Sequence, residues 1–494
     1  MANAKMSRAG SRGLVPALVG MALGGVGCSG TTTVPPLIGS DQGLNRSLQD
    51  WSDSFQPEAV ALRDWELRGD DITLEGSRPV EFYVALALER NPEIRAAREA
   101  VAAQGEVIAQ VTTLDDPEVA ISFMPFSSAM LETAAGQAGT GVNFAQKFPW
   151  LGTLRARGAA AEQETRIAWA RLAQTELRIM EETRVTALEL AANRRVRVIL
   201  EETQAALDQV VEAAQIRYRT GVATQSEVLR ARLERERISD QLLDLDRVAR
   251  QIQADLAGLL NASPQSQPEV IDPAPLPPDG LSEDLDGLLA VALHSRPELE
   301  EQRAGLARDQ ANRELARLKF RPNVTAGVNW QTISAEDALS PVANGNDVVM
   351  FTVGFNLPVR RQRLWAALAE ADLRVVERLH RYDATRAETI RLVRRLTARV
   401  ETVRAQIELM RDSLLPTASR AVDVGLAGYR VDRVEFAQLI GNVTQKQALE
   451  LQLVRLETDL AQTLATLERT IGAALIQTDP SQLAQSLESA PLRP

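Results

Sequence analysis

The chain contains very little of the chemistry that enzymes and metalloproteins use. Cys28 is its only cysteine, and His294 and His380 are its only histidines, in 494 residues. Disulfides, thiolate metal sites and histidine-based catalysis therefore have almost no raw material. No phosphate-binding glycine loop, nucleophile elbow or pair of catalytic carboxylates stands out either. We therefore expect no catalysis, no cofactor and no resident metal.

Basic charge and long apolar runs are also scarce. The formal net charge is −11, the pI is near 5.1, and no clustered Lys/Arg face occurs, which argues against a nucleic-acid partner. Beyond residue 28 there is no run of eighteen apolar residues, so a transmembrane helix is not expected. If the chain meets a membrane, strands or a covalent lipid must make the contact.

The N-terminus has the pattern of an export signal. Three basic residues precede an apolar, glycine-rich stretch over residues 14–27, which predicts a signal peptide at residues 1–27. Cys28 follows directly and resembles the cleavage site of a bacterial lipoprotein, where this cysteine would be acylated. Gly25 stands where such signals usually have an aliphatic residue, so an ordinary secretory signal with a chance cysteine remains the alternative.

Aromatic residues are few, and half of the twenty fall in two windows, residues 119–150 and 320–365. Within these windows apolar side chains alternate with small or polar ones. The apolar positions are Val119, Ile121 and Phe123 in the first window, and Val324, Ala326, Val328, Trp330, Phe351, Val353, Phe355 and Leu357 in the second. Strands of this kind match a membrane barrel around a wet lumen. A sandwich strand with one solvated face is the alternative.

Three features favour the membrane barrel. Aromatic residues gather near the strand ends, as they do at membrane interfaces, at Phe126, Phe148, Trp150, Trp330 and Trp365. The connecting segments 127–140 and 331–347 are expected to be polar loops, and the sequence offers no second sheet for packing. Because four strands cannot close a barrel around a channel, we expect three copies to contribute twelve strands, and hence a homotrimer.

The sequence is one strand–strand–helix–helix unit written twice. Three landmarks recur in order at offsets of 205, 209 and 211 residues: Leu86–Ile94 with Val291–Leu299, Phe148-Pro149 with Leu357-Pro358, and Tyr218-Arg219 with Tyr429-Arg430. Such order indicates duplication. The predicted organisation is a signal peptide, an N-terminal extended segment at 28–78, a first repeat at 79–262, a proline-rich linker at 263–284, a second repeat at 285–475 and a C-terminal tail at 476–494.

Long helices follow each strand pair. No proline occurs between Thr153 and Tyr218, which predicts a helix of about 65 residues and about 100 Å. The second copy predicts a helix from Arg363 to Leu415, where Pro416 should kink it. Its apolar seam is narrow, as in coiled coils, at Ile390, Val393, Leu396, Val400, Val403, Ile407 and Met410. A coiled-coil scaffold in the periplasm or cytosol, without channel activity, would explain these helices but not the strands or the leader.

Four segments carry a family resemblance: Asn91–Ile94, Gln146–Gly152, Arg217–Ala223 and Gly428–Phe436. With them the sequence, over about residues 80–475, resembles the TolC-type family of outer-membrane efflux proteins. The resemblance implies a mainly α fold with a small β part, in which a trimeric twelve-stranded β-barrel in the outer membrane continues into a long periplasmic α-helical barrel. It also implies passive conduction, contact with outer-membrane lipid, and two partners, a periplasmic adaptor and an inner-membrane efflux pump. Metal ions, drugs and peptides all remain open as cargo.

The two hairpin tips are the predicted docking and closure region. A helix that descends from the barrel must reverse at its far end, and Gly221 is the residue that can turn with positive φ. Asp432 stands at the matching place in the second tip and tolerates the same conformation. The residues expected at the closed end, where an adaptor docks, are Arg217, Tyr218, Arg219, Thr220, Gly221, Val222, Tyr429, Arg430, Val431 and Asp432.

The resemblance further implies a gating contact between Glu227 and Tyr429, with Arg430 or Arg433 as an added charged partner. For each of these contacts a solvated helix end remains the alternative. Family members often carry acidic residues nine and twelve positions after the second tyrosine, where this chain has Gln438 and Gly441. An acidic aperture ring is therefore not expected here. Glu435 would replace it only if its side chain faces inward.

Overall fold

The computed structural model describes residues 74, 76–123, 132–133, 136–263, 265–271, 285–335 and 345–473. The chain divides into two units, Met1–Leu67 and Arg68–Pro494, and every described residue belongs to the second. The expectations for the signal peptide, Cys28, Phe126 and the C-terminal tail at 476–494 lie outside the described residues. Most of the segment at 28–78 and of the linker at 263–284 lies outside them as well.

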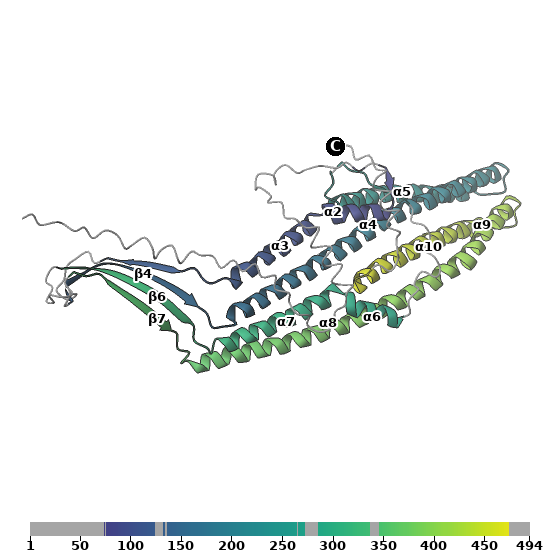
Figure 1. The fold of residues 1–494 in the computed structure, drawn as a ribbon. Helices are drawn as coiled ribbons and strands as arrows, with labels where there is room; N and C mark the ends of the chain where they lie inside the picture. The colour runs from purple at the N-terminus through teal and green to yellow at the C-terminus, as the bar shows by residue number, and fades with distance from the viewer. Residues whose placement is uncertain are drawn as a thin grey trace, which may run out of the picture. The chain divides into compact units, whose positions relative to one another are not determined.

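The two copies repeat the same order of elements (Figure 1). The first contains α2 (Val80–Arg90), α3 (Pro92–Thr112), β2 (Glu118–Ser122), β3 (Glu132–Thr133), β4 (Gly136–Phe148), α4 (Thr153–Arg219) and α5 (Gln225–Leu259). The second contains α6 (Leu285–Ser295), α7 (Pro297–Leu318), β6 (Val324–Ser334), β7 (Val348–Phe355), α8 (Arg361–Leu409), the π-helix η2 (Met410–Leu414), α9 (Leu415–Arg430) and α10 (Phe436–Ile471). Short strands β1 (Ser77–Arg78) and β5 (Glu269–Val270) pair in parallel. The predicted duplication is confirmed.

The main sheet is antiparallel, with β2, β4, β6 and β7 in that order and β3 paired to β4. Its register aligns the apolar positions into rows across all four strands. One row is Val119, Phe144, Val328 and Phe351, and the next is Ile121, Val142, Trp330 and Val349. The other face carries rows such as Ala120, Asn143, Asn329 and Met350. The predicted alternation of the strands is therefore confirmed.

The polar loops predicted at 127–140 and 331–347 are too long, because strand pairing continues into both segments. β4 begins at Gly136 and β6 runs to Ser334, with a register shift between Ala138 and Gly141. In isolation the glycines of this stretch look like turn residues, but here they permit close approach of the strands. A Cβ on Gly139 would lie 2.6 Å from Thr332 Oγ1, and one on Gly141 would lie 2.7 Å from Ser122 Oγ.

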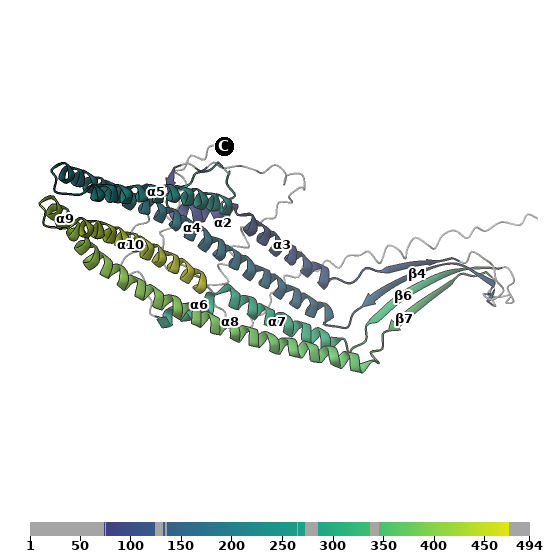
Figure 2. The same ribbon diagram turned by 180° about the vertical axis from the view of Figure 1, so that it is seen from behind.

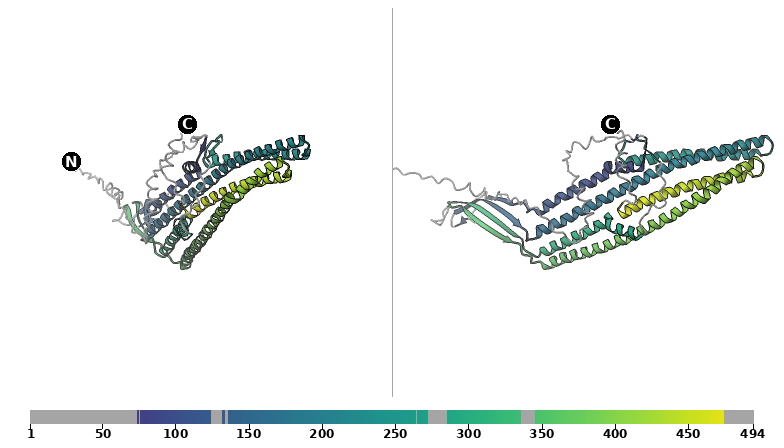
Figure 3. Two further views of the ribbon diagram at one scale, coloured as in Figure 1. Left: turned by 90° about the vertical axis from the view of Figure 1, so that its right-hand side faces the viewer. Right: turned by 45° about the vertical axis from the view of Figure 1, so that its right-hand side comes forward.

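The helices follow the predicted course closely. α4 has 67 residues, which corresponds to about 100 Å of continuous helix. It packs against α3, α5, α7 and α10, and α7 lies between α4 and α8 (Figures 2 and 3). Among the described residues no helix is both long enough and apolar enough to cross a membrane.

The seam of α8 packs onto its neighbours, as predicted. Val393 and Leu396 pack with α6 and α10, while Val400, Val403 and Ile407 pack against Leu460 and Leu464 of α10. The interruption expected at Pro416 begins one turn earlier, as the π-helix η2. Proline has no N–H and its ring crowds the carbonyl four residues back, so the turn preceding it widens.

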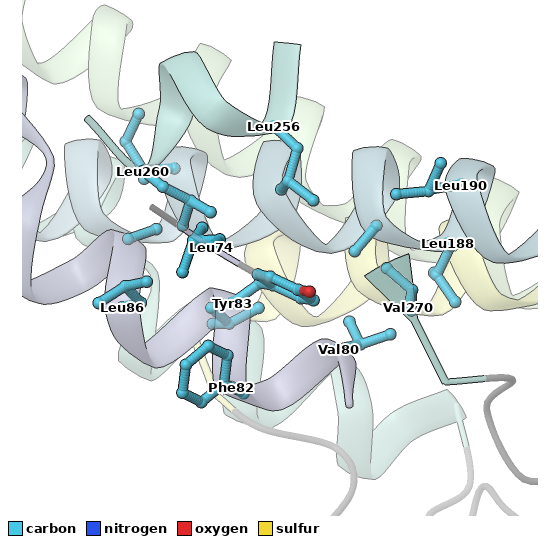
Figure 4. Close-up of a cluster of buried hydrophobic side chains, with 14 of the residues drawn as sticks. Leu74, Val80, Phe82, Tyr83, Leu86, Leu188, Leu190, Leu256, Leu260 and Val270 are labelled. Carbon is cyan, nitrogen blue, oxygen red and sulfur yellow. The ribbon is translucent and has the colours of Figure 1, made fainter. Parts of the chain in front are cut away.

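A second core forms where α2, α4 and α5 meet (Figure 4). Tyr83 is 1% exposed, its hydroxyl donates to the Glu269 carbonyl at 2.7 Å, and its burial raises the pKa of the phenol to about 12. The Asn91 side chain accepts from the Glu93 N–H and donates to the Leu259 carbonyl, both at 2.9 Å. This explains the Asn-Pro-Glu-Ile motif, because Asn91 caps α3 while holding the end of α5. Arg296 takes this place in the second copy and donates to Thr389 Oγ1 at 2.9 Å.

Candidate functional site

Each long helical hairpin reverses through a short turn that contains one residue with positive φ. In the first hairpin this residue is Gly221, with φ of 79°, between α4 and α5. In the second it is Asp432, with φ of 61°, between α9 and α10. Both backbone expectations are confirmed. Because a non-glycine residue is strained in this region, Asp432 must be held there by its surroundings.

Arg217, on the last turn of α4, holds Asp432 in place and thereby connects the two tips. Its guanidinium donates to the Tyr429 carbonyl and to the Asp432 carboxylate, and it lies 4.4 Å from the centroid of the Tyr429 ring. The Arg217 side chain is only 12% exposed. One cation thus serves a carbonyl, a carboxylate and an aromatic face at once, an arrangement that suits the planar guanidinium.

Tyr429 is the centre of the site. It is 1% exposed and packs in a cluster built from α4, α5, α9 and α10, with its ring 6.0 Å from that of Phe436. Its hydroxyl donates to Glu227 Oε2 at 3.0 Å. Glu227 also accepts from the backbone N–H of Thr224 at 3.2 Å, in a capping box at the start of α5. The structure therefore brings the predicted pair Glu227 and Tyr429 together within one protomer.

The electrostatic setting keeps the tyrosine neutral. Burial first, and then the hydrogen bond and charge of Glu227, raise the pKa of Tyr429 to about 12, while the Arg217 cation opposes the shift. The hydroxyl is therefore a proton donor at any physiological pH. The combination joins the ends of α4, α5 and α9 and the turn before α10 through one buried hydroxyl donor, one cation and the carboxylates of Glu227 and Asp432. Such a contact can break and re-form without covalent chemistry.

The other predicted tip residues lie on the outside of the turns. Tyr218, Val222 and Val431 are 47%, 55% and 62% exposed. Arg219, Thr220, Arg430 and Arg433 are exposed as well. Within the described part of the protomer, Arg430 and Arg433 form no ion pair. The cationic partner of Tyr429 in this protomer is Arg217 instead.

The three aperture candidates lie on the start of α10. Glu435 is the residue before its first turn, and Glu435, Gln438 and Gly441 are all exposed. The buried positions between them, Phe436 and Leu439, pack toward Tyr429. The candidates therefore lie on the face of α10 that points away from the rest of the protomer.

Sequence reasoning placed Arg217 at the tip but missed its contacts with Tyr429 and Asp432. The residues are separated by 212 and 215 positions. The charge pattern is the signal that could have found these contacts. A basic residue, Arg217, lies next to the tyrosine of the first tip, and an acidic residue, Asp432, follows the tyrosine of the second. Among the described residues no group of three or more His, Cys, Asp or Glu side chains is placed to hold a metal ion.

Comparisons with known proteins agree with this architecture. A family model described as outer membrane efflux protein matches residues 83–262 and 288–473. Among solved structures, VceC from Vibrio cholerae is 18% identical with a TM-score of 0.67, over 80% of this chain and 97% of that one. CmeC from Campylobacter jejuni is 14% identical with a TM-score of 0.65, over 92% and 96%. MtrE from Neisseria gonorrhoeae is 18% identical with a TM-score of 0.59, over 85% and 94%. No curated protein matches in sequence.

Proposed function

Because this chain belongs to the outer membrane efflux protein family, we propose that it is the exit duct of a tripartite pump, closed at its helical tips and opened when a partner docks there. The chain is an outer-membrane efflux channel whose strands lie in the membrane and whose helices lie in the periplasm. The duct carries out no catalysis of its own, and an inner-membrane pump supplies the energy through a periplasmic adaptor.

The observation that carries this proposal is the apolar face of the sheet. Two of its rows, those of Val119 and Ile121, run unbroken from β2 to β7, and side chains such as Ile121, Phe351 and Val353 are 68%, 79% and 64% exposed. In water such a surface would favour aggregation, whereas lipid satisfies it. A coiled-coil scaffold leaves this face unexplained and is not favoured.

Three copies complete the wall. β2 and β7 are the two edges of the four-stranded path, so the edge of one protomer is free to pair with the opposite edge of the next. Closure by three copies gives twelve strands around a wet lumen, with the polar rows facing inward. On the apolar face, Trp330 is suited to the boundary between membrane and water. Its ring lies on the side that faces lipid, while its indole N–H donates to Asp347 at 3.2 Å.

The contacts of Tyr429 hold the duct shut. Tyr429 binds Glu227 of α5 and stacks on Arg217 of α4, so the second hairpin of a protomer is fastened to the first. Releasing these contacts lets the hairpins move apart, and the opening at the tips widens. This rests on a buried tyrosine that has two charged partners, unlike an isolated surface ion pair.

Planar-bilayer recordings of the purified trimer test the closure. Tyr429→Phe removes the donor of the 3.0 Å hydrogen bond and Glu227→Gln removes the negative charge of its acceptor, each with little change in volume, so mean conductance should rise in both and severalfold in Tyr429→Phe. The double variant should add little to Tyr429→Phe, because both changes act on the same contact. Tyr382→Phe in α8 and Asp240→Asn in α5 are the matched controls. Unchanged conductance in both tip variants would remove the closure from the proposal.

The adaptor is proposed to bind the outside of the turns. Each turn presents an exposed valine, Val222 or Val431, beside an exposed arginine, Arg219 or Arg430. Arginine is enriched at protein interfaces, and the exposed valine beside it adds apolar surface that a partner can cover. Val222→Asp combined with Val431→Asp should abolish export by cells while leaving the trimer and its bilayer conductance intact. Normal export by this variant would contradict docking at the tips.

A further inference from the structure

A cavity of about 770 Å³ lies where the strands meet the helices, far along α4 from the tips. Its lining comes from the end of β4, the first turns of α4 and α8, the last turns of α7, and the segments next to β6 and β7. The backbone of this junction is held by Asn323, whose side chain accepts from the Trp150 N–H at 3.2 Å, and by Asn356, whose side chain accepts from the Asn323 N–H. The cavity is therefore part of a defined structure.

The lining carries an excess of positive charge. Five of its basic side chains form no ion pair with any described residue: Lys147, Arg157, Lys319, Arg321 and Arg363. Arg321 does lie over the Trp150 ring, at 5.9 Å from its centroid, a contact that leaves its charge in place. The carboxylates of the lining are fewer. Asp309 is bound by Arg308 and Arg378, and Glu370 lies 3.6 Å from Arg374, so Asp115 is the only lining carboxylate without a cation among the described residues.

The cavity opens on the polar side of the sheet. Lys147 pairs in register with Thr325, which in turn pairs with Gly354, whereas the apolar row beside them is Phe148, Val324 and Phe355. Lys147 therefore points to the face opposite the lipid. Asn323 and Asn356, which continue the alternation of Thr325 and Gly354, line the same cavity. In the proposed channel this face is the lumen.

We propose that these cations form an anion-attracting ring in the lumen at the level of the strand–helix junction, so that the open channel favours anions and its cargo is anionic. This inference rests on the proposed function, because the ring exists only when three protomers share one lumen. Threefold symmetry then brings fifteen unpaired cations to one level, in a passage with low-dielectric walls that strengthen their field. The chemical class favoured is small anions, either inorganic or bearing carboxylate or phosphate groups, over free metal cations.

The test is the reversal potential of bilayer currents across a KCl gradient. Wild-type trimer and the Tyr429→Phe variant should both conduct chloride in preference to potassium. Combining Lys147→Gln, Arg157→Gln and Arg363→Gln should lower the chloride-to-potassium permeability ratio severalfold. The preference should also weaken between 0.1 M and 1 M salt, because the screening length falls from about 10 Å to about 3 Å.

Matched controls come from the same helices. Arg155→Gln and Arg361→Gln lie two residues from Arg157 and Arg363, about 200° around the helix, and neither lines the cavity. Together they should leave the permeability ratio unchanged. Citrate, used as a probe anion, should reduce the chloride current of the wild type more than that of the triple variant.

The outcomes separate the two proposals. Channels that prefer potassium would indicate that carboxylates near the tips, such as Glu435, dominate, and would overturn the anion ring while leaving the duct intact. A triple variant with wild-type selectivity would overturn it as well. Absence of any current from both the wild type and Tyr429→Phe would instead contradict the channel itself, and the ring with it.

Discussion

Arg217 and Asp432, 215 residues apart in the chain, form an ion pair that joins the turn of the first hairpin to the turn of the second. The arginine is almost enclosed, with a side-chain exposure of 12%, while the aspartate is 71% exposed and sits at a positive φ of 61°. The buried partner is therefore the one that fixes the geometry. Asp432 meets two requirements at one position: its backbone adopts the left-handed conformation, and its side chain supplies a negative charge to Arg217.

Replacing Arg217 by lysine should open the channel even though the charge is kept. An ammonium group cannot serve the Tyr429 carbonyl, the Asp432 carboxylate and the Tyr429 ring at the same time. We expect a loss of about 1–2 kcal/mol in the tip contacts, from the cation–π contact and one charge-assisted hydrogen bond. Bilayer conductance of Arg217→Lys should exceed that of the wild type and approach that of Arg217→Met. A lysine variant as closed as the wild type would mean that charge alone is sufficient.

Two substitutions at Asp432 separate backbone strain from charge. Asp432→Asn keeps a side chain that tolerates positive φ but loses the ion pair with Arg217, so it should destabilise the tip by about 0.5–1 kcal/mol. Asp432→Gly loses the same pair but relieves about 1 kcal/mol of strain, and its thermal stability should remain near that of the wild type. Both should raise conductance equally if the charge maintains closure. Differential scanning calorimetry and bilayer recordings together make the comparison.

The contribution of the Tyr429 hydroxyl to closure should weaken at strongly alkaline pH. The folded-state pKa of Tyr429 is raised to about 12 from 10.0, chiefly by burial. A raised pKa means that the stabilisation is complete below pH 10 and is lost as pH rises toward 12. The stability difference between wild type and Tyr429→Phe should be constant from pH 6 to about 9.5 and shrink above it. Tyrosinate absorbance should show one fewer late-titrating group in the variant. Loss of the difference near neutral pH would contradict the assigned contact.

Adjacent residues of β7 should respond oppositely to a charge. Phe351 lies on the apolar face, paired with Val328, whereas Met350 lies on the other face, paired with Asn329. Phe351→Arg should cost about 2–4 kcal/mol near the middle of the bilayer and reduce the yield of heat-modifiable trimer. Met350→Arg should assemble normally because its side chain meets the aqueous lumen. Equal yields from the two variants would contradict the assignment of the faces.

Periodicity accounts for most of what could be predicted from the sequence. The spacing of Val393, Val400 and Ile407 predicts the buried seam of α8, and the alternation of Phe351, Val353 and Phe355 predicts one face of β7. These patterns are local, so a single sequence contains them. The membership of the efflux family was likewise reached from ordered motifs in both copies.

Contacts between distant segments could not be predicted in the same way. The role of Arg217 depends on the rotation of α4 relative to α9, which is set by packing along both helices rather than by any local pattern. The start of β4, from Gly136 to residue 140, was predicted as loop because the close approach that explains Gly139 is to Thr332, on a neighbouring strand distant in the sequence. The basic residues of the cavity come from three separate elements, with Lys147 on β4, Arg157 on α4 and Arg363 on α8. No short sequence motif could therefore predict the cavity.

Within the part of the chain that the structure describes, the outer edges of β2 and β7 have no neighbouring strand, so the sheet of a single protomer is incomplete. The backbone N–H and C=O groups along both edges can form hydrogen bonds only with strands of the neighbouring subunits, because lipid tails neither donate nor accept hydrogen bonds. Insertion of a single chain would leave these groups without hydrogen-bond partners in the hydrocarbon region, which is energetically costly. Biogenesis of this protein should therefore couple the association of three chains to their entry into the membrane.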